Sequence, residues 1–164
     1  MFVSVEEGIP KDQTEQADEV AADAQPEVPG DALFFTLLYV EDNPANLMLV
    51  EAIVERRPDV HLLSAWDAIH GIEKARTLQP DVILMDINLP GINGIQALKI
   101  LREDLLTAHI PVIALSSNIM PSDIKKGLEA GFFRYLTKPI IVATFLVELD
   151  MALKVARNNT DANN

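Results

Sequence analysis

Four short apolar runs in this chain of 164 residues each end at a polar or charged side chain. The runs, with the residues that follow them, are LLYV before Glu41, VILM before Asp86, PVIAL before Ser116 and FRYLT before Lys138. Apolar runs of this length that alternate with amphipathic stretches are typical of a parallel sheet covered by helices. The strands of such a sheet point the same way, and ligands bind where their carboxyl ends meet. We therefore expect these four side chains to line one pocket.

The hydrophobic periodicity predicts five strands and five helices that alternate along the chain. Strands are expected at about 33–40, 60–65, 81–85, 110–115 and 132–136. Helices are expected at about 44–57, 67–78, 95–105, 121–130 and 141–156. Pro44 suits the first turn of its helix, Asp67 suits a helix cap, and Gly131 suits a helix end. These patterns indicate a single α/β domain.

The net charge of −12 is concentrated near the amino terminus, where residues 1–32 carry nine acidic side chains and a single lysine. The part from Gly8 to Gly30 has no apolar period, so it lacks the apolar surface needed to form a core. We expect an acidic flexible linker or tail at 1–32, a folded domain at 33–157 and a disordered tail at 158–164. The folded domain has no basic stripe, so direct binding to nucleic acid is not expected.

The composition excludes several classes of site. The chain has no cysteine, which rules out a disulfide framework, a zinc–thiolate centre and a thiol nucleophile. No apolar run reaches the roughly 18 to 20 residues that cross a bilayer, and the acidic amino terminus does not resemble a signal peptide. We therefore expect a cytoplasmic protein with no segment inserted in a membrane.

Three of the expected pocket residues are carboxylates: Glu41, Asp42 and Asp86. Two such charges repel by about 1 kcal/mol at about 4 Å in water, so their convergence requires a cation. Mg²⁺ suits this set because it prefers carboxylate and phosphate oxygens and keeps several waters. Asp86, alone at the end of the central strand, is the candidate nucleophile toward phosphorus. Lys138 would balance the added charge, and the Ser116 hydroxyl would donate to a phosphoryl oxygen.

Each of these residues also has an ordinary structural interpretation. Asp86 and Ser116 both suit turns or helix caps. The Glu41–Asp42 pair suits an acidic helix start favoured by the helix dipole, and Lys138 suits a solvated surface charge. The functional interpretation is favoured because all of these residues are expected at strand ends of the same sheet.

The segments LLYVEDNPANL, VILMDINLPGINGI, PVIALSSNIM and AGFFRYLTKP resemble the receiver domain of two-component response regulators. The resemblance covers about residues 33–157. The spacing also agrees, with 44 residues from Asp42 to Asp86, 30 from Asp86 to Ser116 and 52 from Asp86 to Lys138. The resemblance implies a flavodoxin-like (βα)5 three-layer sandwich with a parallel five-stranded sheet of order 2-1-3-4-5.

The same resemblance implies a reaction. A phosphohistidine on a histidine kinase or a histidine phosphotransfer protein would donate its phosphoryl group to Asp86. Mg²⁺ would be held by Glu41, Asp42, Asp86 and the backbone carbonyl of Asn88. The chain would then be a phosphoacceptor signalling domain that assists its own phosphorylation and dephosphorylation, and not an enzyme.

The resemblance further implies a conformational switch. Ser116 would move toward the phosphoryl group while Tyr135 turns inward, which shifts the population of two packings of the face formed by the fourth helix, fifth strand and fifth helix. A half-buried strand tyrosine is the alternative interpretation of Tyr135. Asn88 and Asn118 would tune the lifetime of the acyl phosphate. Pro139 would form a cis peptide that aims the preceding lysine into the pocket.

Two rival classes fit the sequence less well. An aspartyl-nucleophile, Mg-dependent phosphohydrolase of flavodoxin-like topology would carry an acid–base aspartate two residues after its nucleophile. Asn88 occupies that position here and cannot transfer protons. A nucleotide-binding module would need a Gly-rich loop after the first strand, where Glu41 and Asp42 would instead repel a phosphate.

The sequence leaves the output of the domain open. About eight polar residues follow the last predicted helix, so no effector domain is expected there. The chain is either a stand-alone regulator that docks on a downstream protein or a receiver from the carboxyl end of a hybrid histidine kinase. The string EDNPANL is similar to receivers of hybrid kinases, which favours the second arrangement. A homodimer through the face formed by the fourth helix and the fifth strand is also left open.

Overall fold

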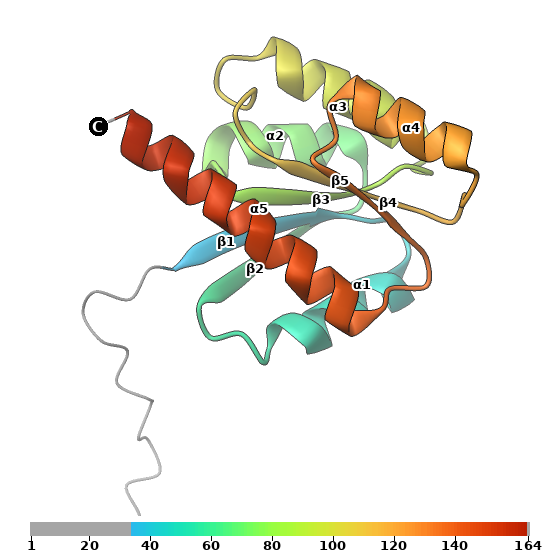
Figure 1. Cartoon of the computed structure of the whole chain (residues 1–164), viewed down its shortest axis with the longest axis horizontal. Coiled ribbons are helices and arrows are strands. Elements are labelled where there is room, and N and C mark those ends of the chain that lie inside the picture. Colours follow the sequence, from blue (N-terminus) through green and yellow to red (C-terminus); the bar gives the residue numbers. More distant parts are fainter. Residues whose placement is uncertain (1–33, 164) are drawn as a thin grey trace, which may run out of the picture. The chain divides into compact units, whose positions relative to one another are not determined.

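Five parallel strands alternate with five helices in the computed structural model, which describes residues 34–163 (Figure 1). The strands are β1 (Phe35–Val40), β2 (Val60–Ala65), β3 (Val82–Asp86), β4 (Val112–Ser116) and β5 (Arg134–Thr137). The helices are α1 (Pro44–Val54), α2 (Ala68–Leu78), α3 (Gly94–Glu103), α4 (Pro121–Ala130) and α5 (Val142–Ala162). The strand order β2-β1-β3-β4-β5 confirms the expected flavodoxin-like topology. The predicted linker at 1–32 lies outside the described residues.

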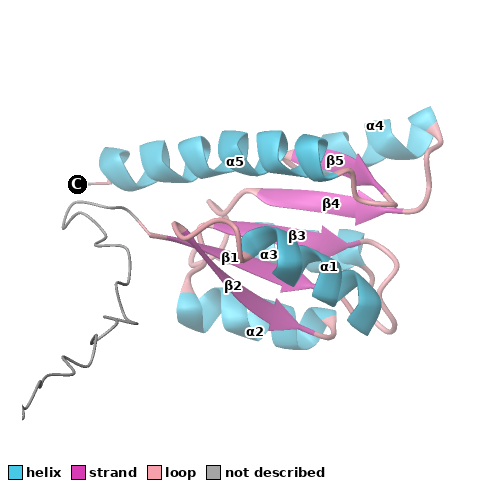
Figure 2. Cartoon of the chain, turned by 90° about the horizontal axis from the view of Figure 1, so that it is seen from below, coloured by secondary structure: helices cyan, strands magenta, loops and turns pink. Residues whose placement is uncertain are grey.

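The helices form two layers around the sheet, with α1 and α5 on one face and α2, α3 and α4 on the other (Figure 1 and Figure 2). Successive side chains of a strand point to opposite faces, so each strand contributes to both halves of the core. In β1, Leu37 and Tyr39 pack on the side of α1 and α5. Leu38 and Val40 pack on the side of α2 and α3. All five residues of the central β3 are buried, as expected for a strand covered on both faces.

Local sequence signals fix the ends of several helices. Asn43 caps α1 through its side-chain oxygen. Asp67 caps α2, as predicted, by accepting a hydrogen bond from the backbone N–H of His70 at 2.8 Å. Gly131 ends α4 with a φ of 113°, a left-handed conformation that glycine adopts without strain.

Two other helices end earlier than the sequence predicts. α1 ends at Val54 rather than near residue 57, and Arg57 instead pairs with Asp150 of α5 at 2.9 Å. α3 ends at Glu103, which leaves Leu105, predicted to be helical, 94% exposed. The apolar spacing puts Leu105 on the buried side of the predicted helix. Such spacing does not show at which residue a helix ends.

The last helix is longer than predicted. α5 continues to Ala162, so the prediction of a disordered tail from residue 158 is wrong for the described residues. The Asn159 amide donates to the His109 carbonyl at 3.3 Å, and the Thr160 hydroxyl donates to the Ala156 carbonyl at 3.1 Å. These contacts are polar, so they leave no apolar signature in the sequence. Among the described residues, no helix is long and apolar enough to span a membrane.

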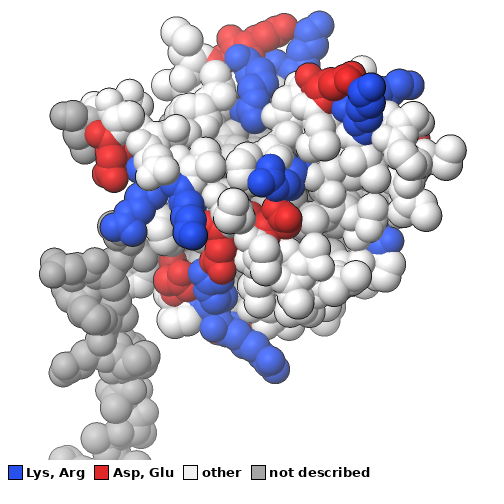
Figure 3. All heavy atoms as spheres, viewed as in Figure 1, with Lys and Arg blue, Asp and Glu red and all other residues white. Residues whose placement is uncertain are grey.

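Acidic and basic side chains are interspersed on the face of the molecule shown in Figure 3. Ion pairs include Arg57–Asp59 and Arg134–Glu148, each with a nitrogen–oxygen distance of 2.8 Å. Partly exposed pairs of this kind contribute about 0.2 to 1 kcal/mol each. The apolar layers, rather than these ion pairs, therefore hold the helices on the sheet.

Candidate functional site

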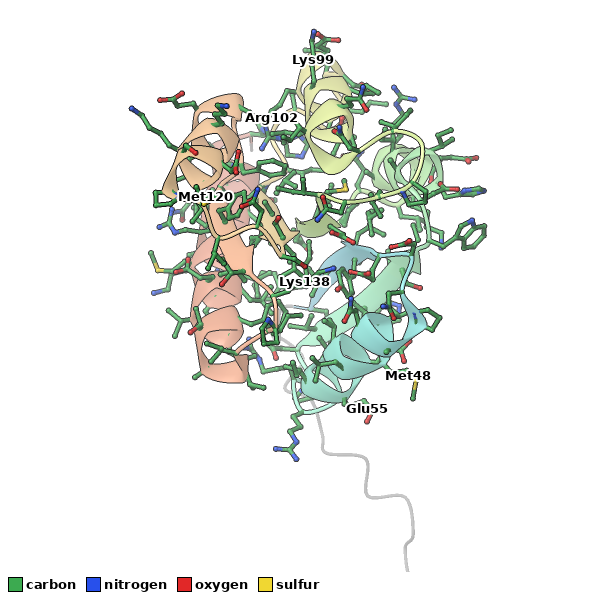
Figure 4. The ribbon with its side chains drawn as sticks, turned by 90° about the vertical axis from the view of Figure 1, so that its right-hand side faces the viewer. Met48, Glu55, Lys99, Arg102, Met120 and Lys138 are labelled. Atoms are coloured by element: carbon green, nitrogen blue, oxygen red, sulfur yellow. The ribbon has the colours of Figure 1, made fainter. Side chains whose placement is uncertain are left out.

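The carboxyl edge of the sheet gathers the four strand endings that the sequence singles out. Glu41 follows β1, Asp86 closes β3, Ser116 closes β4 and Lys138 follows β5. In Figure 4, Lys138 lies near the centre of this edge, with α1 on one side and the start of α4 on the other. Its Nζ lies 3.2 Å from Asp86 Oδ2 and 3.3 Å from Glu41 Oε2. Its backbone N–H donates to the Ser116 carbonyl at 2.8 Å, which places the end of β4 beside the contacts of Lys138 with Asp86 and Glu41.

Glu41 is a buried carboxylate, only 3% exposed, that is surrounded by hydrogen-bond donors. Its Oε1 accepts hydrogen bonds from the Asn43 backbone N–H and the Asn46 side-chain amide, both at 3.2 Å. Its Oε2 accepts from the Tyr39 hydroxyl at 2.8 Å and from the Lys138 ammonium at 3.3 Å. Four donors on two oxygens hold the side chain in one orientation.

Asp86 is 2% exposed and ends a fully buried strand. Burial raises the pKa of its carboxyl, and the nearby charge of Glu41 adds to this effect. A hydrogen bond from the Asn88 backbone N–H to Oδ1 at 3.0 Å and the contact with Lys138 oppose the rise in the pKa. Asp86 therefore carries a charge that its surroundings only partly compensate, which suits a group that reacts with an electrophile.

Three carboxylates at this edge form a set of oxygen ligands. Glu41, Asp42 and Asp86 each offer one oxygen, and these atoms all lie within 4.8 Å of one another. Asp42 is exposed, whereas the other two are buried. Lys138 supplies one positive charge beside three negative ones, so the cluster retains an excess negative charge. A hard divalent cation that prefers oxygen ligands, such as Mg²⁺, fits this donor set.

Residues at and just after the ends of β4 and β5 flank the site. The Lys138–Pro139 peptide is cis, as the sequence resemblance implied. Ser116 is buried, and its Oγ accepts a hydrogen bond from the Asn118 backbone N–H at 3.1 Å. The Asn118 side chain donates to Asp123 of α4 at 2.6 Å. Asn118 is therefore held by α4 in this structure rather than by the carboxylate cluster.

Tyr135 of β5 lies against α4 at a glycine. A β-carbon at Gly127 would lie 2.8 Å from the Tyr135 ring, closer than real side chains approach. The ring is half-buried in this position. The sequence singled out Tyr135 but not Gly127, because nothing in the helix pattern marks that glycine as a packing contact.

Tyr39 is a further residue of the site that the sequence did not reveal. Its position two residues before Glu41 was the available signal, because residues i and i+2 of a strand point to the same face. In the sequence this strand is an apolar run, which indicates that Tyr39 belongs to the core and does not indicate a role for its hydroxyl. The structure places its hydroxyl against the carboxylate of Glu41.

Gly94 gives the site a testable packing constraint. A β-carbon at Gly94 would lie 2.6 Å from the Asp86 carbonyl oxygen and 2.8 Å from Ile87 Cα, both backbone atoms that cannot move freely. Replacing a helical glycine with alanine ordinarily stabilises by up to about 1 kcal/mol. We expect Gly94→Ala instead to destabilise by roughly 1 to 3 kcal/mol, the usual cost of overpacking. Urea unfolding measures this, and a variant as stable as the wild type would contradict it.

Comparison with known proteins agrees with this architecture. A family model of the response regulator receiver domain matches residues 37–150. Protein PilH of Pseudomonas aeruginosa is 36% identical over 117 residues, which cover 71% of this chain and 96% of that protein. The polar-differentiation response regulator DivK of Brucella anthropi is 33% identical over 111 residues, which cover 68% of this chain and 89% of that protein.

Solved structures show the same similarity. The receiver domain of a sensor histidine kinase from P. aeruginosa, solved with a magnesium ion coordinated in its active-site cleft, matches with a TM-score of 0.67 and 31% identity over 74% of this chain and 98% of that one. The chemotaxis protein CheY4 of Vibrio cholerae shares the fold, with a TM-score of 0.68 and 24% identity over 73% of this chain and 99% of that one. The chain belongs to the response regulator receiver domain family and is a receiver domain of two-component signalling.

Proposed function

We propose that this receiver domain accepts a phosphoryl group on Asp86, with Mg²⁺ bound by Glu41, Asp42, Asp86 and the backbone carbonyl of Asn88. The observation that carries the proposal is the position of the buried Asp86 carboxylate, in contact with Lys138 and within 4.8 Å of two further acids. A carboxylate held among like charges and beside one ammonium is prepared to react once a cation balances the cluster.

The chemical step is a transfer between two nucleophiles. An oxygen of the Asp86 carboxylate attacks phosphorus, and the new O–P bond replaces the P–N bond of a phosphohistidine. The donor imidazole leaves with the electron pair of the broken bond. Mg²⁺, when bound, supplies positive charge to the phosphoryl oxygens. The Lys138 ammonium, 3.2 Å from Asp86, balances the charge that builds on those oxygens, and the Ser116 hydroxyl donates a hydrogen bond to one of them.

The proposed output is a population shift on the face formed by α4, β5 and α5. Phosphorylation offers Ser116 a new acceptor, and its movement would make room for the Tyr135 ring, which packs against Gly127 in this structure, to turn further inward. Asn88 and Asn118 adjoin the site and are proposed to set the lifetime of the acyl phosphate, which the domain itself helps to hydrolyse. Large apolar side chains of α4, of α5 and of the residues just before these helices are exposed, and a downstream protein or a second copy could cover them: Met120, Leu128, Ile141, Val142 and Val147.

The proposed phosphoryl donor is a histidine kinase or a histidine phosphotransfer protein in the cytoplasm. A solved relative is itself the receiver domain of a sensor histidine kinase, which supports a hybrid kinase as the parent protein. The phosphohydrolase alternative is not favoured, because Asn88 occupies the position of the acid–base aspartate and its amide cannot transfer a proton.

The first test is the position of the phosphoryl group. We expect incubation with acetyl phosphate and Mg²⁺ to add one phosphoryl group by intact mass, and chelation of Mg²⁺ to prevent the gain. Reduction of the acyl phosphate with borohydride, followed by peptide mass analysis, should locate the modification at Asp86. Modification of any other residue, or labelling that ignores Mg²⁺, would contradict the proposal.

A further inference from the structure

Tyr39 connects the apolar core with the carboxylate cluster. The residue is fully buried in β1, and its ring packs in the half of the core that faces α1 and α5. Its hydroxyl donates to Glu41 Oε2 at 2.8 Å. A phenol is protonated at neutral pH, so the hydroxyl acts as the donor and the carboxylate as the acceptor.

The length of Glu41 explains why such a donor matters. A glutamate has one more rotatable bond than an aspartate, so its carboxylate loses more freedom when it is held at a metal site. The donors on Oε1 are the backbone N–H of Asn43, the exposed cap of α1, and the side-chain amide of the half-buried Asn46 in its first turn. The Tyr39 hydroxyl also donates to this carboxylate, and it belongs to a side chain that is fully buried in the core.

Tyr39 also shares an oxygen with the ammonium of the site. Glu41 Oε2 accepts from both Tyr39 and Lys138, and the same Nζ lies 3.2 Å from Asp86 Oδ2. A donor on Oε2 lowers the negative charge that this oxygen presents to Lys138. The ammonium is therefore shared between Glu41 and Asp86 rather than drawn to Glu41 alone.

We propose that Tyr39 is a positioning residue for the phosphoacceptor site, whose hydroxyl holds the Glu41 carboxylate in the orientation that receives Mg²⁺. The inference rests on the proposed function, because Glu41 is a metal ligand only if the cluster binds the ion. Groups that orient a metal ligand from behind typically contribute 10-fold to 100-fold to metal affinity. A tyrosine that merely satisfies its hydroxyl in the core would contribute to stability alone.

The test compares Mg²⁺ affinity, measured by titration calorimetry, in the wild type and in Tyr39→Phe. Phenylalanine keeps the ring in the core and removes only the hydroxyl. We expect the dissociation constant for Mg²⁺ to rise by about 10-fold. Thr107→Val is the matched control, because Thr107 is also fully buried and its hydroxyl donates to the Leu101 carbonyl at 2.7 Å, away from the site. Both variants should lose stability, whereas only Tyr39→Phe should lose Mg²⁺ affinity.

A double-mutant cycle separates positioning from a general loss of structure. In a Glu41→Asp background the carboxylate is one methylene shorter, and we expect it to lose the hydrogen bond from the Tyr39 hydroxyl. Tyr39→Phe should then change the Mg²⁺ dissociation constant by less than about 2-fold, since coupled positions are not additive. Equal Mg²⁺ affinity of the wild type and Tyr39→Phe, or the same 10-fold effect in both backgrounds, would overturn the inference. Failure of the wild type to bind Mg²⁺ would instead overturn the proposed function itself.

Discussion

Replacing Asp86 with asparagine is expected to abolish phosphoryl incorporation and, in the absence of Mg²⁺, to stabilise the fold. The amide cannot form an acyl phosphate, so acetyl phosphate should add no mass to the variant. The amide also removes a buried charge from beside Glu41. We expect a gain on the order of 1 kcal/mol, which for a domain of this size raises the Tm by roughly 4 °C.

The pH dependence of this gain follows from the direction of the pKa shift. Burial raises the pKa of Asp86 in the folded state above its value in the unfolded chain, so the folded state holds its proton more tightly. Ionisation of Asp86 therefore costs folding free energy as the pH rises through the range between the two pKa values. The asparagine variant has no such cost. Thermal unfolding with a chelator should show a larger Tm difference near neutral pH than in mild acid.

Other results for Asp86→Asn would show which part of this expectation is wrong. Phosphoryl incorporation that persists in Asp86→Asn would move the acceptor to another residue. A variant that is less stable than the wild type at neutral pH would mean that the contact between Asp86 and Lys138 outweighs the burial of the charge.

Replacing Lys138 with alanine is expected to slow phosphorylation by acetyl phosphate about 100-fold at saturating Mg²⁺. Loss of one group that stabilises developing charge in a transition state typically costs about 100-fold to 1000-fold in rate. Lys138 contacts both Glu41 and Asp86, so the change also removes the ammonium that separates two buried carboxylates. We therefore expect a lower Tm without Mg²⁺ and a larger rise of the Tm when Mg²⁺ is added.

Lys99→Ala provides the matched control for lost positive charge. Lys99 is exposed on α3, and Figure 4 shows it well away from Lys138. This variant should keep the wild-type rate of phosphorylation, followed by intact mass over time. If the two lysine variants lost the same amount of activity, the effect would reflect the net charge of the protein. If Lys138→Ala kept the wild-type rate, Lys138 would have no part in the transfer.

Much of the fold could be predicted because its signals are local. The apolar run at 81–85 differs from β3 by a single residue at each end, and Asp67 and Gly131 lie at helix ends as expected. The convergence of Glu41, Asp86 and Lys138 followed from one rule about parallel strands. These features depend on hydrophobic period and backbone conformation, which a sequence records directly.

The features that the sequence did not reveal depend on contacts between distant residues. The helical end of α5 is held partly by a polar bond from Asn159 to the loop at His109, 50 positions away. The Asn118 side chain is oriented by Asp123, and the choice between that partner and the carboxylate cluster leaves no pattern in the chain. Tyr39 belongs to the core and to the site at once, and an apolar run shows only the first role.

Glu41 and Lys138 are 97 positions apart in the sequence, so the contact between them forms only when β5 has folded onto the sheet. A nascent or partly unfolded molecule with β1 to β4 in place but β5 undocked would present the acids without their ammonium. Such a molecule would lack one of the groups that make transfer fast. Under the proposed function, fast phosphorylation would therefore require that β5 has docked against β4.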